Sequence, residues 1–537
     1  MSLGHPDFKV RTLVQVQMYA GAGVIRYFCS EVSDPSGCRV QDSGGTVRFW
    51  EPRVRLSSLV QDCGNLDGGM QKHQINSLTL RTNWQGSSAY DDLLNDALTF
   101  RIEGATVTIW TETADADTAF SDDVDDYDKR FVGQARVDGA ATIDVFGGVL
   151  RLMISEIDGP WTLPLTENRL TTDTYSSLPA ANEELLLPMI FGNTENAQGI
   201  DVVAYCIDNS SSTPGFVIGT TGAASNYDNP IAVRRGGTTI TAQSPITDAP
   251  GANEWGSWSP SAGTFYIDDT GNNIDDSTII TVKALGIEDA SSAAAPTDAD
   301  EVIESLRVAS GWGATFDATV MGRWTTDLSS NLNIKQLLGV FPVGRSSTPV
   351  MLGNVLDDAM KRTCSVMRVG LDGRWACVLP GGTDSTLHTL YGGDIQSMRL
   401  QINPAGDYAT EVVGVWYAFT ATFNDIIPIR NSSGADSTEE ALLHGQEVIR
   451  DEETIWQQNR VQYVTNERFN LRSQAMYVST TRISLRAGDS IVCGDRVQYQ
   501  VYDLTTLLPA GHVRRITRSL TGGWAEVIAY HLGYWPS

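Results

Sequence analysis

The chain has 537 residues and a formal net charge of −27, with 65 acidic against 38 basic side chains. This length suggests several domains and allows a large core, so folding requires neither disulfides nor metals. The excess of negative charge repels nucleic-acid phosphates, which argues against a nucleic-acid-binding protein. A charged share of only 19% and the 50 glycines favour many short strands joined by turns.

The seven cysteines form no CxxC pair, which argues against a zinc ribbon and against a dense disulfide framework. Cys29, Cys38 and Cys63 could pair or cluster, but buried thiols are the simpler expectation. No apolar run reaches the ~18 residues that span a bilayer, and the first residues do not form a signal peptide. We therefore expect a protein made in the cytoplasm.

The first 157 residues are expected to form one β-domain, a closed barrel or a sandwich. Apolar and polar residues alternate in several segments, and one short helix is expected at 90–97. The predicted strands cover 8–28 (two strands), 46–60, 74–82, 98–111, 130–137 and 141–155 (two strands).

An Asp-rich stretch at 115–128 lies within this domain. Clustered carboxylates are what a hard cation such as Ca²⁺ needs, although the spacing does not match an EF-hand. The alternative is a solvated loop without a metal. The candidate ligands are Asp122, Asp123, Asp125, Asp126 and Asp128.

Residues 158–190 are rich in Pro and Thr and read as an extended connector, after which 191–297 form a second β-rich unit. In that unit Trp255 and Trp258 lie close together in a Gly/Ser-rich loop. Exposed tryptophans can stack on sugar rings, so these two are candidate glycan contacts. Alternatively, they pack under a strand edge or at a subunit interface.

Residues 298–470 are predicted to form a mixed α+β unit with helices at 291–311, 331–339, 352–367 and 437–456. Thr297 is the expected N-cap of the first helix. A hairpin is expected at 369–382, with Asp372-Gly373 as its turn. Residues 471–537 are again β and are expected to complete a barrel with earlier strands.

Catalytic motifs are missing from the sequence: there is no GxSxG, HExxH, GxxxxGK[ST] or GxGxxG before a helix. The six histidines are scattered. A pair of catalytic carboxylates has no motif, so a glycan hydrolase stays open as a minor alternative. We expect no enzyme activity and no cofactor.

Four segments resemble parts of the baseplate-hub and tail-tip proteins of tailed, siphophage-like bacteriophages. LPMIFGN (187–193) resembles the entry into their middle domain, and LDGRWACVLPGG (371–382) after a helix resembles their hub module. ISLRAGDSIVCGD (483–495) and the strands of 512–531 resemble the closing part of a hub barrel. Each segment is short, and their order is the stronger signal.

The resemblance implies a virion protein at the tail tip, a homotrimer with two tube-like β-barrels per subunit. One barrel is expected from 1–155 and the other from strands near 300–350 and 470–535, with 191–297 as an outer insertion. Its partners would be tube, tape-measure and fibre proteins, and a host receptor indirectly. DNA would pass an acidic lumen without specific binding. The competing function is a receptor- or glycan-binding tail protein.

Overall fold

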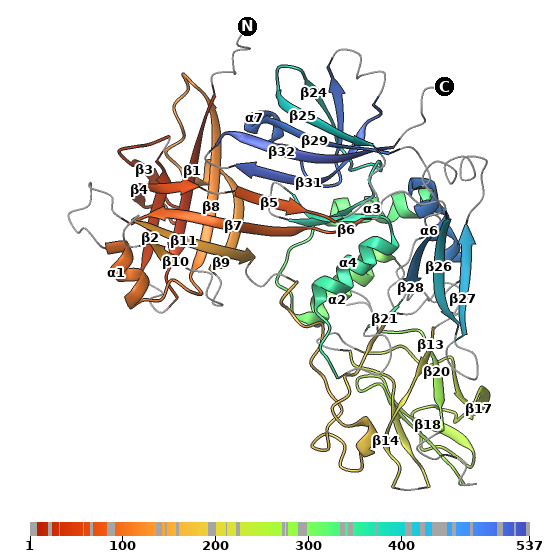
Figure 1. Ribbon diagram of the computed structural model, residues 1–537. Helices are drawn as coiled ribbons and strands as arrows, with labels where there is room; N and C mark the ends of the chain where they lie inside the picture. The colour runs from red at the N-terminus through yellow and green to blue at the C-terminus, as the bar shows by residue number, and fades with distance from the viewer. Residues whose placement is uncertain are drawn as a thin grey trace, which may run out of the picture.

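The structure is a computed structural model that describes residues 8–19, 24–31, 33–56, 58–64, 68–82, 92–135, 142–144, 148–156, 160–191, 200–210, 212–221, 226–270, 274, 278–287, 298–332, 334, 339–341, 347–370, 374–402, 411–418, 425–431, 448–453, 458–472, 476–501, 508–519 and 522–532. The fold is mainly β with a few helices, as the sequence predicts. Figure 1 shows four regions: an N-terminal β-lobe, a C-terminal β-lobe, a helical centre and, at the end opposite the lobes, the β-rich unit that was expected at 191–297.

The N-terminal lobe is a closed barrel. Each strand of the ring pairs with the next, and the last pairs with the first. The order around the ring is β1 (Phe8–Gln17), β2 (Ile25–Ser30), β4 (Val47–Leu56), β7 (Lys72–Arg81), β11 (Val149–Glu156), β9 (Asp128–Ala135) and β8 (Thr106–Asp115). Short elements flank it: β3 (Cys38–Gln41), β10 (Thr142–Asp144), α1 (Asp92–Thr99) and the 3₁₀ turn η1 (Val124–Asp126).

Alternating side chains fill this barrel, because successive residues of a strand point to opposite faces. Val14, Val16, Val107 and Ile109 are fully buried members of its core. The stretch expected as one strand at 46–60 is two strands, β4 and β5 (Ser58–Asp62), and the second leaves the barrel. The helix predicted at 90–97 is present as α1.

The C-terminal lobe is a curled sheet built from the last strands of the chain and from earlier ones. Its strands run in the order β24, β30, β31, β32, β29 and β25, and β5 pairs with β31 beyond β30, on the edge opposite β32. Their bounds are β24 (Leu387–Tyr391), β25 (Ile395–Ile402), β29 (Met476–Ser484), β30 (Arg496–Gln500), β31 (Gly511–Ser519) and β32 (Trp524–Leu532), with α7 (Leu485–Gly488) between β29 and β30.

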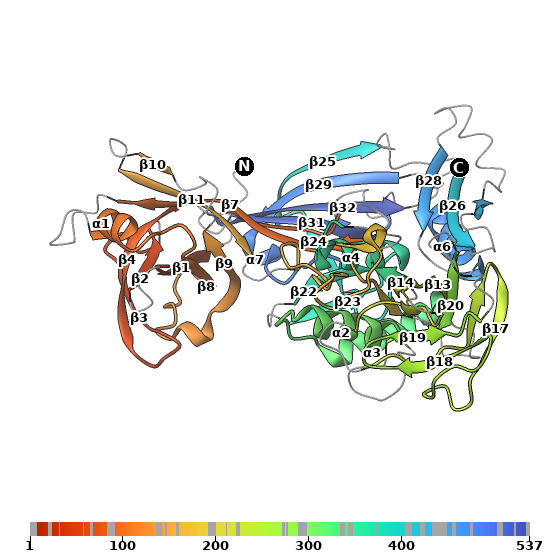
Figure 2. The same ribbon diagram turned by 90° about the horizontal axis from the view of Figure 1, so that it is seen from below.

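The expected contribution of 300–350 to this second lobe is wrong. That stretch is mainly helical, with α2 (Ala299–Ser310) and α3 (Ala318–Asn331), followed by the short strand β21 (Gly339–Phe341). Together with α4 (Leu352–Arg362), these helices form the centre of the molecule in Figures 1 and 2. A small sheet lies beside them, made of β6 (Gly69–Met70), β22 (Val366–Val369) and β23 (Trp375–Val378).

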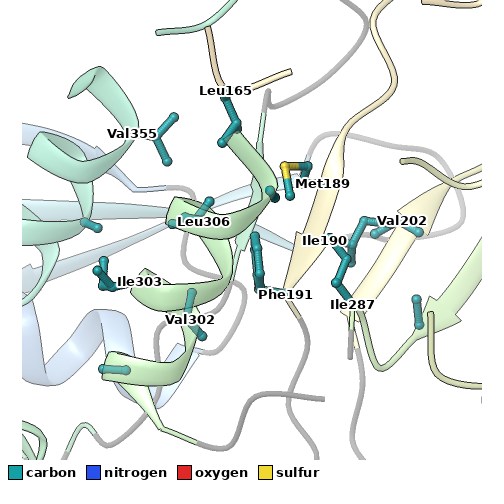
Figure 3. Packing of buried hydrophobic residues seen from close by; sticks show 14 of the residues in the cluster. Leu165, Met189, Ile190, Phe191, Val202, Ile287, Val302, Ile303, Leu306 and Val355 are labelled. Carbon is teal, nitrogen blue, oxygen red and sulfur yellow. The ribbon is translucent and has the colours of Figure 1, made fainter. Parts of the chain in front are cut away.

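Helix α2 forms where the sequence places helix-start signals, one residue later than predicted. Its N-cap is Asp298, not Thr297, and the Glu301 carboxylate accepts a hydrogen bond from the Asp298 N–H at 3.0 Å. Gly311 ends the helix in a left-handed conformation, φ 71°. Val302, Ile303 and Leu306 lie on its buried face, as Figure 3 shows.

The second β-unit shares one core with the central helices. Its sheet has the order β13, β20, β16, β17, β18, β19, β15, β14. The bounds are β13 (Ile200–Val203), β14 (Tyr205–Asp208), β15 (Gly215–Val217), β16 (Ala232–Arg235), β17 (Thr238–Ala242), β18 (Glu254–Ser259), β19 (Thr264–Ile267) and β20 (Ile280–Ala284), preceded by η2 (Ala180–Asn182). Figure 3 shows β12 (Met189–Phe191) between this unit and α2.

Another small sheet corrects the helix prediction at 437–456. It holds β26 (Glu411–Ala418), β27 (Asp425–Asn431) and β28 (Val448–Glu453), with α6 (Gln458–Arg472) packed against β26 and β27. The predicted helix at 437–456 is therefore wrong over 448–453, where the chain is a strand; 432–447 lie outside the described residues. The helix predicted at 331–339 is also wrong beyond its first residue in the described part, since α3 ends at Asn331 and β21 starts at Gly339.

The hairpin predicted at 369–382 exists between β22 and β23, which pair antiparallel. Its proposed turn, Asp372-Gly373, lies outside the described residues. No described helix is long and apolar enough to cross a membrane.

Candidate functional site: the junction of the two β-lobes

Two long strands carry one sheet from the N-terminal lobe into the C-terminal lobe. On one edge, the first half of β7 pairs with β5 and its second half with β4; on the other edge β7 pairs with β11 along the barrel. Strand β5 in turn pairs with β31 over Ser58–Asp62. In the described part of the chain this gives a continuous 16-stranded sheet. Because backbone hydrogen bonds run without a break, the two lobes are held as one body.

A buried arginine fixes the seam between β5 and β31. Arg518 is 1% exposed, and its guanidinium donates to the Gln61 side-chain oxygen and to the Ile491 carbonyl. It also donates to the Asp489 carbonyl at 3.4 Å. A buried cation is tolerated only where acceptors replace its water. Arg518 thus ties the segment after α7 to the strand that comes from the N-terminal lobe.

Two buried cysteines meet at the end of the same seam. The Cys63 N–H donates to the Arg514 carbonyl at 2.9 Å, and the Cys493 thiol donates to that carbonyl at 3.3 Å. Both side chains are fully buried with Val366. Burial raises the pKa of the Cys63 thiol well above its ordinary value, so it stays protonated. Both cysteines are free thiols.

Asp495 joins the C-terminal lobe to the small central sheet. Its carboxylate, 2% exposed, accepts from the Arg368 guanidinium at 2.7 Å and lies 2.8 Å from His388 Nε2. The Val492 and Thr386 N–H groups donate to it at 3.2 and 3.3 Å. Four partners from three segments therefore converge on one buried carboxylate, which is the saturated arrangement that a buried charge requires.

Two consecutive glycines with positive φ connect the N-terminal lobe to the central module, which consists of the helices α2, α3 and α4 and the small sheet of β6, β22 and β23. Gly68 and Gly69 have φ of +111° and +152°, and a Cβ on Gly68 would lie 2.3 Å from the Ser365 carbonyl oxygen. The next residue, Met70, donates its N–H to the Asp357 carboxylate at 2.9 Å. Only glycine allows this close approach, which lets β6 pair in parallel with β22.

Both end strands of the sheet in the C-terminal lobe carry exposed apolar side chains. Tyr391 and Leu387 on β24 are 55% and 45% exposed, and Ile402 and Leu400 on β25 are 54% and 37% exposed. Among the described strands, β25 pairs only with β29, so its other edge is open. An open edge with apolar neighbours is a surface that other chains can pair with.

The Asp-rich stretch does not gather into a metal cage in the described residues. Asp123 caps the turn η1, since its carboxylate accepts from the Asp125 N–H at 3.0 Å. Asp126 accepts from the Ser121 hydroxyl at 2.6 Å, and Asp122 and Asp125 are exposed. Asp128 begins β9. Among described residues, the group that could hold a metal is elsewhere: Cys29, Asp34 and Cys38.

The two candidate glycan-binding tryptophans are buried. Trp255 and Trp258 are 2% and 3% exposed and lie on strand β18, not in a loop. The Trp255 ring packs edge-on against Phe265 with centroids 6.0 Å apart. Stacking on a sugar requires an exposed ring face, and neither ring has one. This corrects the glycan-contact expectation for these two residues.

The scattered histidines have structural surroundings where they are described. His531 is fully buried, with its Nδ1 2.7 Å from the Pro509 carbonyl and its Nε2 2.8 Å from the Ser479 hydroxyl. Burial lowers its pKa, and burial with nearby Arg514 lowers the pKa of His512 to about 3. His388 belongs to the Asp495 cluster. Local sequence patterns do not show these contacts, because the carboxylate partner of His388 is 107 positions away and the partners of His531 are 22 and 52 positions away.

Comparisons with known proteins give structural likenesses only. No family model matches the chain, and no curated protein matches its sequence. The 43 kDa tail protein of prophage MuSo2 from Shewanella oneidensis is 8% identical, with 97% of this chain and 98% of that chain covered and a TM-score of 0.39. The tail protein from Neisseria meningitidis MC58 is 7% identical, with 98% of each chain covered and a TM-score of 0.36. The prophage tail protein gp18 from Listeria monocytogenes EGD-e is 8% identical, with 92% and 94% covered and a TM-score of 0.37.

Proposed function

We propose that this chain is a structural subunit of a virus tail, a baseplate hub that closes the end of the tail tube. The observation that carries the proposal is the pair of barrel-like β-lobes joined by β5 and β7 into one sheet. The sequence resemblance to hub and tail-tip proteins implies two such barrels per subunit. The proposal names the same class of protein as the three solved structures described above, but it rests on this chain's own lobes and segments.

A mechanical role follows from this arrangement. Identical subunits would meet along strand edges and apolar faces to form a ring, with three subunits contributing two barrels each. The open edge of β25 and its exposed neighbours Leu400 and Ile402 are the surface that we assign to this contact. Tube, tape-measure and fibre proteins would dock on the ring, and fibres rather than this chain would carry the receptor contact.

The negative charge of the chain suits a channel for DNA. A net charge of −27 per subunit makes a ring that repels phosphates, so DNA passes without adhering. A solved ring with a strongly positive lumen would contradict this part of the proposal.

Oligomer mass tests the hub directly. We expect a trimer of the purified full chain by native mass spectrometry, and a monomer for the double variant Leu400→Lys/Ile402→Lys, because charge on an edge strand blocks pairing. Leu98→Lys is the matched control: Leu98 is 70% exposed on α1, so this variant should stay trimeric. Antibody labelling of virions that contain the protein should mark one end of the tail. A wild-type monomer, or labelling spread along the particle, would overturn the proposal.

A further inference from the structure

Three metal-ligand side chains converge beside the N-terminal barrel. Cys29 lies on β2, Cys38 begins β3, and Asp34 lies in the turn between these strands. Their two sulfur atoms and one carboxylate oxygen all lie within 4.8 Å of one another. Cys29 is fully buried and Cys38 is 9% exposed, so water has little access to the thiols.

The local sequence builds this convergence. Strand β4 pairs with both neighbours: Cys29 lies opposite Pro52, and Cys38 lies opposite Trp50. The turn folds back because the Asp34 N–H donates to the Ser30 carbonyl at 3.1 Å. Gly37 closes it with φ +80°, where a Cβ would lie 2.8 Å from the Trp50 carbonyl oxygen. The backbone conformation of this turn therefore places the Asp34 carboxylate beside the thiols of Cys29 and Cys38.

Arg11 holds the Asp34 carboxylate in place. Its Nε and Nη2 donate to the two carboxylate oxygens at 2.8 and 2.7 Å, and both side chains are largely buried, 13% and 12% exposed. Arg11 also donates to the Tyr127 hydroxyl at 3.1 Å and stacks on the Phe120 ring. Each carboxylate oxygen keeps a second lone pair for a cation. Outer partners of this kind orient metal ligands in proteins.

The charges of the cluster match a dication. Two thiolates and one carboxylate carry three negative charges, and the Arg11 guanidinium carries one positive charge. A divalent ion would make the buried group neutral, which the low exposure requires. The binding step releases two thiol protons to water and forms two metal–sulfur bonds, with no change of oxidation state.

We propose that Cys29, Cys38 and Asp34 bind a thiol-preferring divalent cation, and the ligand set points to zinc. Zn²⁺ takes four ligands from thiolates, imidazoles and carboxylates. An oxygen ligand would complete the four: the Trp50 and Asp34 carbonyl oxygens lie 3.3 and 4.0 Å from the Cys29 sulfur, and water is the usual fourth ligand where a protein supplies three. The ion would cross-link β2, β3 and, through Arg11, β1. This proposal is independent of the hub function.

Metal content and cobalt spectroscopy test the site on the full chain. When the protein is purified under reducing conditions and given Zn²⁺, elemental mass spectrometry should find one zinc ion per chain. Replacement by Co²⁺ should give a thiolate-to-cobalt charge-transfer band. Cys29→Ser and Cys38→Ser should abolish the band, and Asp34→Asn should weaken zinc binding at least about tenfold. Cys377→Ser is the control, because Cys377 is an equally buried thiol in β23 outside the cluster.

Two results would overturn the proposal. One is a wild-type protein that retains no zinc and gives no thiolate band with Co²⁺. The other is a Cys29–Cys38 disulfide in peptides mapped without reduction from freshly purified protein, since a disulfide removes both thiolates. If the serine variants do not fold, the wild-type cobalt spectrum and a fall in melting temperature on chelation, absent in Asp34→Asn, still decide the question.

Discussion

The N-terminal and C-terminal lobes deal with free strand edges in different ways. The N-terminal ring from β1 to β8 closes on itself, so its own hydrogen bonds leave no open edge there. The C-terminal lobe is curled but open at β25, and it takes β5 from the other end of the chain. It also depends on Asp495 and Arg518, whose partners lie on distant segments. We infer that the N-terminal lobe is stable through its own strand pairing, whereas the stability of the C-terminal lobe depends on contacts with neighbouring segments.

The largest effect is expected where the C-terminal lobe is most dependent. Asp495→Ala leaves Arg368 buried beside His388 without its carboxylate, and breaking a buried pair costs about 3–5 kcal/mol of unfolding free energy. Denaturant unfolding measures the loss, and amide hydrogen exchange shows where it falls. Protection should drop in β24 and β30 while β1 and β8 keep theirs. Equal loss of protection in both lobes would contradict the difference drawn between them.

A second change tests the connection between the lobes through the central module. Gly68→Ala places a Cβ against the Ser365 carbonyl and should cost about 1–3 kcal/mol, the usual range for overpacking. Gly236→Ala is the control, since its φ is also positive, +53°, but nothing lies within 4 Å of the added atom. Its cost should be about 1 kcal/mol, from backbone strain alone. Thermal unfolding of both variants gives the comparison, and equal costs would show that the close approach at Gly68 is unimportant.

Acid should weaken the C-terminal lobe first. The pKa of His512 is lowered to about 3 and that of His531 is also lowered, so the unfolded chain binds more protons than the folded one. The contribution of His512 is complete above about pH 6.5 and is lost as pH falls toward 3, by at most about 1.4 kcal/mol per pH unit; His531 acts in the same direction. Unfolding measured from pH 7 to 4 should show this slope, and His512→Gln should reduce it. A slope unchanged in His512→Gln would contradict the assignment.

The smallest effect is expected at the exposed link between the lobes. Arg486 pairs with Asp115 across them, but the two side chains are 55% and 52% exposed. Exposed ion pairs contribute about 0–1 kcal/mol and are screened by salt. Asp115→Ala should therefore change the unfolding free energy by less than about 1 kcal/mol, and the difference should vanish in high salt. A larger effect would mean that surface charge, and not the buried seam, holds the lobes together.

Local patterns predicted the elements that depend on local chemistry. Helices α2 and α4 follow from start signals and apolar spacing, and most barrel strands follow from alternation. Helix α6 was missed because QNRVQYVTNERFNLR has no continuous apolar face. The helix predicted at 437–456 has acidic residues in its first turn, typical of a helix start, but its described part Val448–Glu453 is β28, because β26 offers it a parallel partner. Tertiary pairing overrides propensity in such cases.

The junction itself could be predicted only in part. The segment ISLRAGDSIVCGD was singled out as a hub element, and it contains Cys493 and Asp495. Their partners, Cys63 and Arg368, lie far away in the chain, and no local pattern names them. The exposure of Trp255 and Trp258 could not be predicted for the same reason, since the sequence around a tryptophan in a Gly/Ser-rich stretch is the same whether its ring is buried or exposed to solvent.

The position of β5 in the chain also sets the order in which the two lobes can fold during synthesis. Residues 58–62 emerge early from the ribosome, but their partner strand, 511–519, is made about 450 residues later. At roughly 5–20 residues per second this is a wait of about 20–90 s. During synthesis the edge of β5 stays unpaired beside a barrel that can already close. The C-terminal lobe can therefore finish folding only when the chain is nearly complete, so a truncated chain would lack the second lobe.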